Sequence, residues 1–308
     1  MIAPSARGSV ARAVAQAKVN LFLRILAREA TGYHQLETLF CRLALGDDVT
    51  VRTNARGRAL DCAGDAIPAG GLGPVEQNLA WRAATAYAAA TGWPNEWAIE
   101  IRKRIPVGGG LGGGSADAGA VLRCLNALAP LPLSPTALVT LAAPLGADVP
   151  FLTRESPLAL AWGRGERLLT LPALPPREVA LVCFPFGVAT RDAYEWLDAE
   201  RGEAVPEACV HDLARLGAWV DIARIARNDF EAVVARRHAD IARALASLRA
   251  SASAEADAAS FALLAGSGST VAFVSGRPLA NAATLVDAPA RMVHTRTADH
   301  VVEVELSD

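Results

Sequence analysis

The stretch PVGGGLGGGSADAG, residues 106–119, limits the possible folds of this chain more than any other feature. It holds seven glycines in fourteen positions, so it has few side chains to pack and much backbone freedom to lose on folding. Such a segment destabilises a fold unless its exposed backbone amides have a use, and the usual use is to bind an anion. The sequence therefore predicts a phosphate-binding loop between a strand and a helix.

Spacing and glycine content argue against three other interpretations of the loop. Gly108, Gly110 and Gly113 satisfy the G-x-G-x-x-G pattern of dinucleotide-binding folds, but residues 130–136, PLPLSPT, lack the acidic residue expected about twenty positions later. A Walker A loop needs a lysine where Ser115 stands. A tight turn or a glycine-packed helix contact needs only two or three glycines. The loop must then neutralise phosphate with amides, a helix N-terminus and a cation from elsewhere in the chain.

Composition narrows the classes of protein and partner. The 308 residues are 52% hydrophobic and 20% charged, which favours two domains with moderate cores over a disordered chain. A net charge of −2 argues against a nucleic acid or a membrane surface as partner, and no apolar run reaches the length of a membrane span. The five cysteines are scattered without a CxxC pair, which excludes a familiar zinc spacing and predicts a reducing compartment. A weak transit peptide stays open for the N-terminus, but we expect a cytoplasmic protein.

The first expected strand carries three polar side chains. Residues 17–26, AKVNLFLRIL, are apolar except for Lys18, Asn20 and Arg24 at even spacing. Because side chains alternate across a strand, these three are expected to point the same way. Lys18 is a candidate for the cation that the glycine loop lacks, although a lone lysine is more often a solvated surface charge.

Two helices are expected beside the loop. Residues 78–92, NLAWRAATAYAAATG, are rich in alanine, with Asn78 as candidate N-cap and Gly92 as the stop. After the glycines, residues 115–129 place apolar side chains on one face at helical spacing, with Ser115 available as N-cap.

A proline-rich stretch divides the chain. LTLPALPPRE, residues 169–178, is the most linker-like segment, so we predict an N-terminal domain of residues 1–172 and a C-terminal domain of residues 173–308. In the second half we expect a strand over VALVCF, several helices, and late strands around GSGSTVAFVS and HVVEVEL. Helices and strands alternate without a strict βαβ rhythm, which favours an α+β fold over a doubly wound sheet.

Three motifs in this order resemble the GHMP kinases, the superfamily of galactokinase, homoserine kinase, mevalonate kinase and phosphomevalonate kinase. They are AKVNLFLRI, the glycine loop and LLAGSGSTVAFV, which together span residues 17–274. Within the superfamily the chain most resembles the kinases of 4-diphosphocytidyl-2-C-methyl-D-erythritol in the non-mevalonate isoprenoid pathway. The stretches that carry this closer resemblance are TGYHQLETLF, GGGLGGGS, GADVPF and NDFE.

The resemblance implies a fold and a reaction. The fold has an N-terminal domain like domain 2 of ribosomal protein S5 and a ferredoxin-like C-terminal domain, with ATP and the alcohol substrate meeting in the cleft between them. The 2-hydroxyl of 4-diphosphocytidyl-2-C-methyl-D-erythritol is expected to receive the γ-phosphoryl group of ATP, with Mg²⁺ as cofactor. A small-molecule substrate, no nucleic acid, no membrane, and a monomer or homodimer are the implied partners.

The resemblance also implies the catalytic residues. Asp148 in GADVPF matches the family's catalytic aspartate, which would orient the alcohol and accept its proton. The alternative is that Asp148 caps a turn before Val149. Lys18 is expected against Asp148, where it would stabilise charge on the transferred group. Asn20 would bond to the substrate.

The implied substrate residues surround the cytidine. Tyr33 and His34 match positions that hold this part of the substrate by stacking and hydrogen bonding, although by themselves they would pass for a rim aromatic and a surface histidine. Tyr194 takes the other stacking position, with Thr190 nearby. The GSGST turn is expected to close over phosphates and substrate. The turn's expected contacts are Gly266, Ser267 and Gly268.

The implied nucleotide residues centre on the glycine loop. Ser115 would add a hydroxyl to phosphate or to Mg²⁺, which the ATP phosphates otherwise hold. Lys103 matches a lysine near the nucleotide, or with its arginine neighbours forms a solvated strand end. Where the family often has serine and asparagine, this chain has Ala116 and Asp117, and a carboxylate so near phosphate is unfavourable unless Mg²⁺ or a basic group offsets it. The expected ATP-binding set is Lys103, Pro106, Val107, Gly108, Gly109, Gly110, Leu111, Gly112, Gly113, Gly114 and Ser115.

Two other functions stay open at this point. One is a different small-molecule kinase or a decarboxylase of the same superfamily, which the intact GYH and GADVPF stretches oppose. The other is a nucleotide-binding protein without catalysis, which Ala116 and Asp117 favour and the pair of Lys18 and Asp148 opposes. Asn228 and Asp229 in NDFE are expected to be structural and to hold the domains together.

Overall fold

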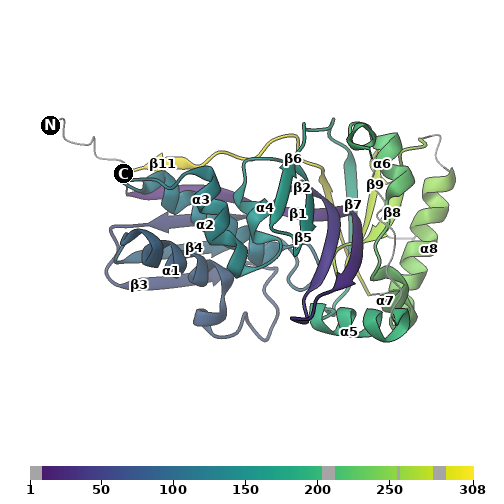
Figure 1. Cartoon of the computed structure of the whole chain (residues 1–308), viewed down its shortest axis with the longest axis horizontal. Helices are drawn as coiled ribbons and strands as arrows, with labels where there is room; N and C mark the ends of the chain where they lie inside the picture. Colours follow the sequence, from purple (N-terminus) through teal and green to yellow (C-terminus); the bar gives the residue numbers. More distant parts are fainter. Residues whose placement is uncertain (1–8, 203–211, 255–256, 280–288) are drawn as a thin grey trace.

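The structure is a computed structural model that describes residues 9–202, 212–254, 257–279 and 289–308. These residues form two β-sheets with helices packed on each, arranged side by side along the longest axis of the molecule (Figure 1). The expected mixture of helices and strands is therefore confirmed.

The first sheet contains seven of the described strands, in the order β11-β1-β2-β4-β3, with β5 paired to β2 and β6 paired to β5. Its strands are antiparallel except for the parallel pair of β3 and β4. The bounds are β1 (Val10–Arg28), β2 (His34–Arg52), β3 (Arg58–Ala63), β4 (Trp97–Arg102), β5 (Leu158–Gly163), β6 (Arg167–Thr170) and β11 (Glu305–Ser307).

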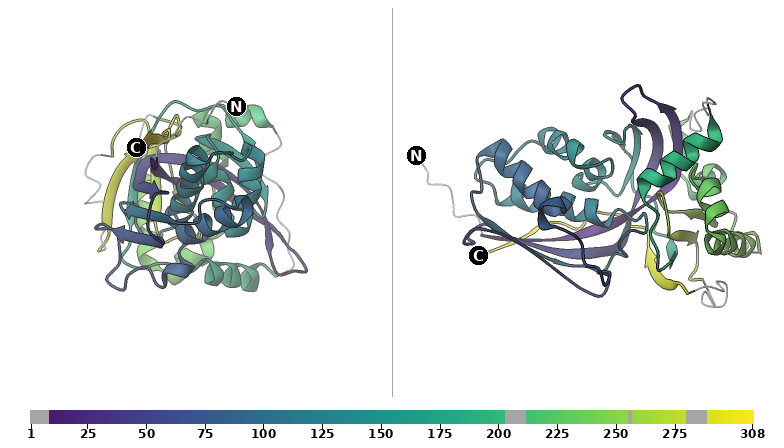
Figure 2. Two further views of the ribbon diagram at one scale, coloured as in Figure 1. Left: turned by 90° about the vertical axis from the view of Figure 1, so that its left-hand side faces the viewer. Right: turned by 90° about the horizontal axis from the view of Figure 1, so that it is seen from below.

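Helices cover one face of this sheet (Figure 2, right-hand view). The longest of them, α2, packs on β1 and β2 and also against α1 and α4. The bounds are α1 (Leu79–Thr91), α2 (Gly113–Leu128), α3 (Pro135–Ala142) and α4 (Val149–Thr153).

The second sheet has the strand order β10-β7-β9-β8, with all neighbours antiparallel. Helices α7 and α8 pack together, and α8 lies against β8 and β9. The bounds are β7 (Glu178–Cys183), β8 (Phe261–Leu264), β9 (Val271–Ser275), β10 (Arg291–Arg296), α5 (Thr190–Arg201), α6 (Trp219–Ile225), α7 (Glu231–Arg237) and α8 (Ala239–Ala254).

Helix α1 begins and ends where its sequence predicts. The side chain of Asn78 accepts a hydrogen bond from the amide of Ala80 at 2.9 Å and so satisfies one of the free amides of the first turn. Gly92 follows the last helical residue with φ +70°, a left-handed conformation that glycine adopts without steric cost.

Strand β1 differs from its prediction at one residue. Its register with β2 shifts between Asn20 and Phe22, and such an irregularity changes which side chains share a face. Lys18 and Asn20 line one cavity together, whereas Nε of Arg24 lies 3.0 Å from Oδ1 of Asp229. The expectation that all three side chains point the same way is wrong for Arg24.

The end of the chain returns to its beginning. Residues 305–307 form β11, which pairs with the first residues of β1 at the outer edge of the first sheet (Figure 1). The strand expected over HVVEVEL is therefore limited to its last residues, since residues 301–304 have no strand structure. This pairing covers the edge of β1 at its first three residues, Val10, Ala11 and Arg12.

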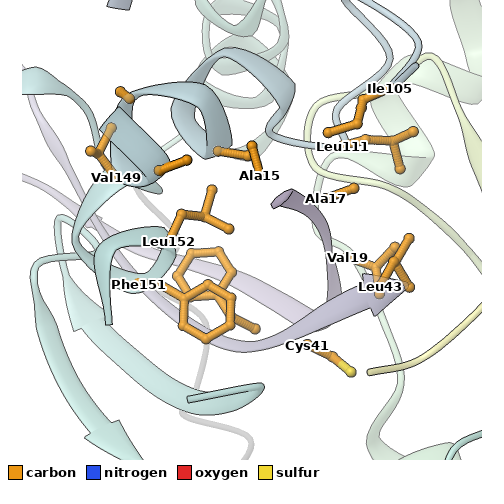
Figure 3. Packing of buried hydrophobic residues seen from close by; sticks show 14 of the residues in the cluster. Ala15, Ala17, Val19, Cys41, Leu43, Ile105, Leu111, Val149, Phe151 and Leu152 are labelled. Atoms are coloured by element: carbon orange, nitrogen blue, oxygen red, sulfur yellow. The ribbon is translucent and has the colours of Figure 1, made fainter. Parts of the chain in front are cut away.

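Two apolar clusters meet across the second sheet. Val179 and Leu181 of β7 belong to the cluster of the first sheet, while the alternate residues Ala180 and Val182 belong to the second cluster. A strand buried on both faces reads as a continuous apolar run, which explains the sequence VALVC. In the first cluster Figure 3 shows Phe151 and the rest of α4 packed beside β1 and β2. This packing places α4 at the site described next.

Candidate active site

A cavity of about 630 Å³ lies where β1, β2, the glycine loop and the GSGST turn meet. Strand, loop and helix residues from far apart in the sequence therefore share one space. Of the predicted site residues, the cavity brings together Lys18, Asn20, Lys103, Pro106, Val107, Gly108, Gly109, Gly110, Leu111, Gly112, Gly113, Gly114, Ser115, Asp148, Thr190, Tyr194, Gly266, Ser267 and Gly268. Tyr33 and His34 do not line it.

Two glycines of the loop pack against the GSGST turn, residues 266–270. A Cβ on Gly109 would collide with the side chain of Thr270, and a Cβ on Gly110 would collide with the carbonyl oxygen of Ala265. The amide of Thr270 also donates to the carbonyl of Gly109 at 3.2 Å. Two of the glycines therefore let the two turns touch, as a structural interpretation of the loop requires. Gly119 likewise lets α2 approach α4, since a Cβ there would collide with the carbonyl of Leu152.

Helix α2 begins two residues before the predicted cap. Gly112 is the N-cap, with φ +71° and no side-chain hydrogen bond, so the prediction of Ser115 as N-cap is wrong. The reason is that the last glycines of the loop adopt helical geometry, which moves Ser115 into the first turn. A first turn without a side-chain cap has amides free to bind an anion at the positive end of a sixteen-residue helix.

Lys18 and Asp148 form an ion pair at the cavity, with Nζ 3.2 Å from Oδ2. Lys18 is buried, whereas the Asp148 side chain is 27% exposed and can be reached by a substrate. Nζ of Lys18 also donates to Oδ1 of Asn20 at 2.8 Å, and Asn20 in turn donates to the hydroxyl of Thr38. Asp148 makes no side-chain cap to α4, so the alternative role as a turn cap is wrong.

Lys103 is held by two carboxylates under the glycine loop. Its Nζ donates to Asp47 at 2.5 Å and to Asp117 at 2.6 Å, and all three side chains are at most 5% exposed. The alternative of a solvated strand end is therefore wrong for Lys103. The basic group that a carboxylate near phosphate requires is present, since it is Lys103 that offsets Asp117.

Burial and charge oppose each other in this cluster. Burial raises the pKa of Asp117 to about 8, with a further rise from Asp47 and an opposing effect of Lys103. Burial lowers the pKa of Lys103, but the charges of Asp117 and Asp47 outweigh it, so the net pKa is raised. Oδ1 of Asp117 has no hydrogen-bond partner and is buried. Lys103 therefore keeps its positive charge at neutral pH, while the pKa of Asp117 stays raised because burial outweighs the attraction to Lys103.

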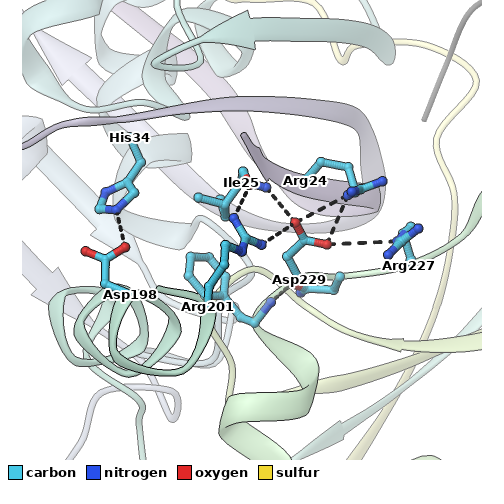
Figure 4. Close-up of polar contacts among 9 residues, drawn as sticks. Arg24, Ile25, His34, Asp198, Arg201, Arg227 and Asp229 are labelled. Carbon is cyan, nitrogen blue, oxygen red and sulfur yellow. Dashed lines mark hydrogen bonds and ion pairs between the residues drawn. The ribbon is translucent and has the colours of Figure 1, made fainter. Parts of the chain in front are cut away.

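An aromatic group marks the other end of the cavity. The ring of Tyr194 stacks on His34 with centroids 4.4 Å apart and meets Phe230 edge-on at 4.8 Å. His34 donates from Nε2 to Asp198 of α5 at 2.7 Å (Figure 4). His34 thus contacts a cavity residue from behind and does not face the cavity itself.

Tyr33 lies outside the cavity, whereas Thr190 lines it. Tyr33 is 59% exposed, and the guanidinium of Arg164 lies 4.1 Å from its ring centroid, outside the cavity. Thr190 starts α5, and its hydroxyl is 3.0 Å from that of Ser267 in the GSGST turn. Two hydroxyls therefore meet at the cavity between α5 and the turn.

The NDFE stretch ties the two sheets together. Asn228 donates from Nδ2 to the carbonyls of Leu264 and Gly266 at 2.7 Å each, which fixes the start of the GSGST turn. Asp229 accepts from Arg24 and from the amide of Ile25 in β1 (Figure 4). These contacts support the structural role expected for Asn228 and Asp229.

Some residues that line or support the site were not predicted from the sequence. Asp47 has no local signal, because its partner Lys103 lies 56 residues away. Asp198 and Phe230 acquire a role only through His34 and Tyr194, which other elements bring to them. Asn78 was predicted only as the N-cap of α1, but it also lines the cavity.

The described part of the chain contains no group of three or more His, Cys, Asp or Glu side chains placed to hold a metal ion. None of its helices has the length and apolar character needed to cross a membrane. The described cysteines are free thiols: Cys41, Cys62, Cys124 and Cys183.

The chain is similar to known proteins both in sequence and in structure. Residues 78–155, which include α1, the glycine loop and Asp148, match the GHMP kinases N terminal domain. The 4-diphosphocytidyl-2-C-methyl-D-erythritol kinase of Moorella thermoacetica is 39% identical over 74% of this chain and 79% of its own length. This chain belongs to the 4-diphosphocytidyl-2-C-methyl-D-erythritol kinase family. It is therefore a GHMP kinase, a member of a superfamily of ATP-dependent kinases.

Other members of the family and of the superfamily agree. The kinase of the same name from Anaeromyxobacter dehalogenans strain 2CP-C is 43% identical over 88% of this chain and 83% of its own length. A solved structure of a 4-(cytidine 5'-diphospho)-2C-methyl-D-erythritol kinase superposes with a TM-score of 0.69, at 34% identity over 93% of this chain and 99% of that one. The homoserine kinase of Cytophaga hutchinsonii, at 16% identity and a TM-score of 0.63, shares the fold. The two-domain GHMP kinase fold that the resemblance implied is confirmed.

Proposed function

We propose that this chain transfers the γ-phosphoryl group of ATP to the 2-hydroxyl of 4-diphosphocytidyl-2-C-methyl-D-erythritol. The observation that carries the proposal is the ion pair of Lys18 and Asp148, 3.2 Å long, at the cavity that the glycine loop also lines. A carboxylate and an ammonium beside a phosphate-binding helix N-terminus are what phosphoryl transfer to an alcohol requires.

Asp148 is the base and orienting group in this proposal. Its partly exposed carboxylate accepts the proton of the attacking hydroxyl while the bond from that oxygen to the γ-phosphorus forms and the bond from the γ-phosphorus to the leaving ADP breaks. Lys18 is buried and positively charged, and it stabilises the negative charge that develops on the transferred group. Asn20 bonds to Lys18 and Thr38, so it fixes the direction of the ammonium in addition to any contact with substrate.

The amides of the glycine loop and of the first turn of α2 bind the ATP phosphates in this proposal. The N-terminus of α2 supports this fit, because Gly112 at the N-cap has no side chain and leaves the amides of the first turn without a side-chain partner. Mg²⁺ bound to the phosphates would neutralise their charge. Since the described residues offer no cluster of metal ligands, the phosphates and the hydroxyl of Ser115 would hold it.

The cytidine end of the substrate is assigned to Tyr194, His34 and Tyr33. Support comes from the stacked rings of His34 and Tyr194 at the wall of the cavity. Thr190 and Ser267, whose hydroxyls meet at 3.0 Å, are placed to contact the part of the substrate between the base and the alcohol. Aromatic faces with a few fixed polar groups suit a pyrimidine nucleotide.

Location and assembly remain proposals of the same kind. The free thiols of the described cysteines support a reducing, cytoplasmic environment. We expect the chain to act on this small molecule as a monomer or homodimer without nucleic acid.

The test is ADP release by the purified protein with Mg·ATP. Four alcohols are compared: 4-diphosphocytidyl-2-C-methyl-D-erythritol, mevalonate, homoserine and methylerythritol phosphate. Turnover with the cytidylyl compound alone is expected. Turnover with another alcohol would discard the substrate assignment and keep the kinase. ATP binding without turnover of any alcohol would contradict the catalytic role of Asp148.

A further inference from the structure

Arg42 is a buried arginine whose side-chain hydrogen bonds, among the residues that the structure describes, go to main-chain oxygens. It lies on β2 with 1% of its surface exposed. Its Nη2 donates to the carbonyls of Phe151 at 3.2 Å, Leu152 at 2.9 Å and Arg154 at 2.8 Å, and its Nε donates to that of Ser156 at 3.2 Å. These carbonyls belong to the last turn of α4 and the residues directly after it.

No carboxylate of the residues that the structure describes pairs with Arg42. Burial lowers the pKa of Arg42 to about 9, and the charge of Arg123 adds to the effect. An unpaired buried cation is costly, so a side chain that keeps one needs strong acceptors. The carbonyls at a helix C-terminus carry the negative end of the helix dipole and supply them.

Helix α4 is too short to be stable without contacts to the rest of the protein. It has five residues, and isolated helices of this length are unstable in water. Its N-cap is Asp148, whose carbonyl accepts the amide of Leu152 at 3.1 Å. The ring of Phe151 stacks on Phe40 and lies 5.2 Å from the guanidinium of Arg42. Arg42 therefore holds the far end of a single helical turn that begins with Asp148.

The strand register joins this contact to the other half of the ion pair. Arg42 on β2 stands directly opposite Lys18 on β1. One residue of this strand pair is Lys18 itself. The other, Arg42, binds the end of the helix α4, which begins at Asp148. We propose that Arg42 is a positioning residue for phosphoryl transfer. By binding the carbonyls at the end of α4, Arg42 fixes Asp148 against Lys18. This inference rests on the role of Asp148 in the proposed function.

The test is a double-mutant cycle measured by single-turnover phosphorylation. Arg42→Met removes the donors and should lower the rate about 10- to 100-fold, the cost of a small misplacement of a reacting group, with little change in the KM for ATP. Asp148→Asn alone should lose most of the rate and still bind ATP. If Arg42 acts through Asp148, adding Arg42→Met to Asp148→Asn should change the rate less than about twofold.

Arg123 supplies the matched control. It is 5% exposed and also binds main-chain oxygens, those of Val302 at 2.9 Å and Val14 at 3.2 Å, but it does not line the cavity of the ion pair. Arg123→Met should lower the unfolding temperature and leave the rate within about twofold of the wild type. Arg42→Lys keeps the charge without the fork of donors, so it should fold and still lose rate.

The outcomes separate the inference from the proposed function. Equal losses from Arg42→Met in both backgrounds, or a wild-type rate in Arg42→Lys, would overturn the positioning role. A wild-type rate in Asp148→Asn would instead overturn the assignment of the base. If Arg42→Met does not fold, the cycle is run with Arg42→Lys, and additivity there overturns the inference in the same way.

Discussion

At the scale of single residues, the ammonium of Lys18 lies 3.2 Å from Oδ2 of Asp148 and 2.8 Å from Oδ1 of Asn20. Lys18 stands out in the sequence because it interrupts an apolar strand, and its position against Asp148 is the one that the family resemblance implies. Asp117 stands out because it follows the glycine loop. The sequence shows that Asp117 needs a basic neighbour but does not show that this neighbour is Lys103, because Lys103 follows β4 and Asp117 lies 14 residues further along, in α2.

Asp117 makes stability depend on pH. Its folded pKa of about 8 lies far above the ordinary value of a carboxyl, so between about pH 4 and pH 8 the folded state keeps a proton that the unfolded state has lost. The free energy of unfolding should therefore fall as pH rises through this window. Asp117→Asn removes this titration, so its unfolding free energy should fall less from pH 5 to pH 8. Urea denaturation across that range checks the difference, and identical slopes for the two proteins would contradict it.

Tyr33 is expected to act in binding and not in the chemical step. It precedes His34, whose ring stacks on Tyr194, but is itself largely exposed in the structure. Tyr33→Ala should raise the KM for the cytidylyl substrate more than it lowers kcat, because stacking on the base is lost far from the transferred group. Tyr33→Phe keeps the ring and serves as control. An unchanged KM in Tyr33→Ala would remove Tyr33 from the substrate site.

At the scale of elements, predictions hold where a local signal is unique. Asn78 and Gly92 bound α1 as predicted, because a side-chain cap and a left-handed glycine occur only at the two ends of that segment. The start of α2 is less defined in sequence, since consecutive glycines can be loop or helix with similar ease. Contacts with the GSGST turn, more than 150 residues away, decide which of them extend the loop.

The contact between the two glycine turns gives a prediction with an internal control. Gly110 has φ +80° and no room for a Cβ beside Ala265, so Gly110→Ala should destabilise the fold and weaken ATP binding. Gly114 is helical, and a Cβ there would meet only Leu79 at an ordinary 3.8 Å. Gly114→Ala should therefore keep the unfolding free energy or raise it by up to about 1 kcal/mol. Thermal unfolding and ATP titration of the two variants test this, and equal stabilities would contradict the tight contact.

At the scale of the whole molecule, composition and motif order anticipate two domains and an α+β fold, but not every contact that joins the halves. We propose that the division predicted at residue 172 separates β6 from β7, with β11 returning to the first sheet. A three-residue strand at the end of a chain has too little pattern to be assigned from sequence. The NDFE stretch indicates that Asp229 joins the halves, but the sequence does not identify its partners, because Arg24 lies in β1 and Arg201 in α5.

Asp229 should therefore control how the halves unfold. Its carboxylate is buried and binds Arg24 of β1 at 3.0 Å and Arg201 of α5 at 2.9 Å. Asp229→Ala leaves Arg24 buried without its partner, so it should cost about 3–5 kcal/mol of unfolding free energy.

The double variant Arg24→Met/Asp229→Leu removes both charges and should recover part of that loss, because an apolar pair of similar volume needs no buried counter-charge. Calorimetry gives a further readout. With the tie broken in Asp229→Ala, a single cooperative transition should separate into two, since each sheet keeps its own apolar cluster. A loss below about 1 kcal/mol with one sharp transition would mean that packing across β7 joins the halves without Asp229.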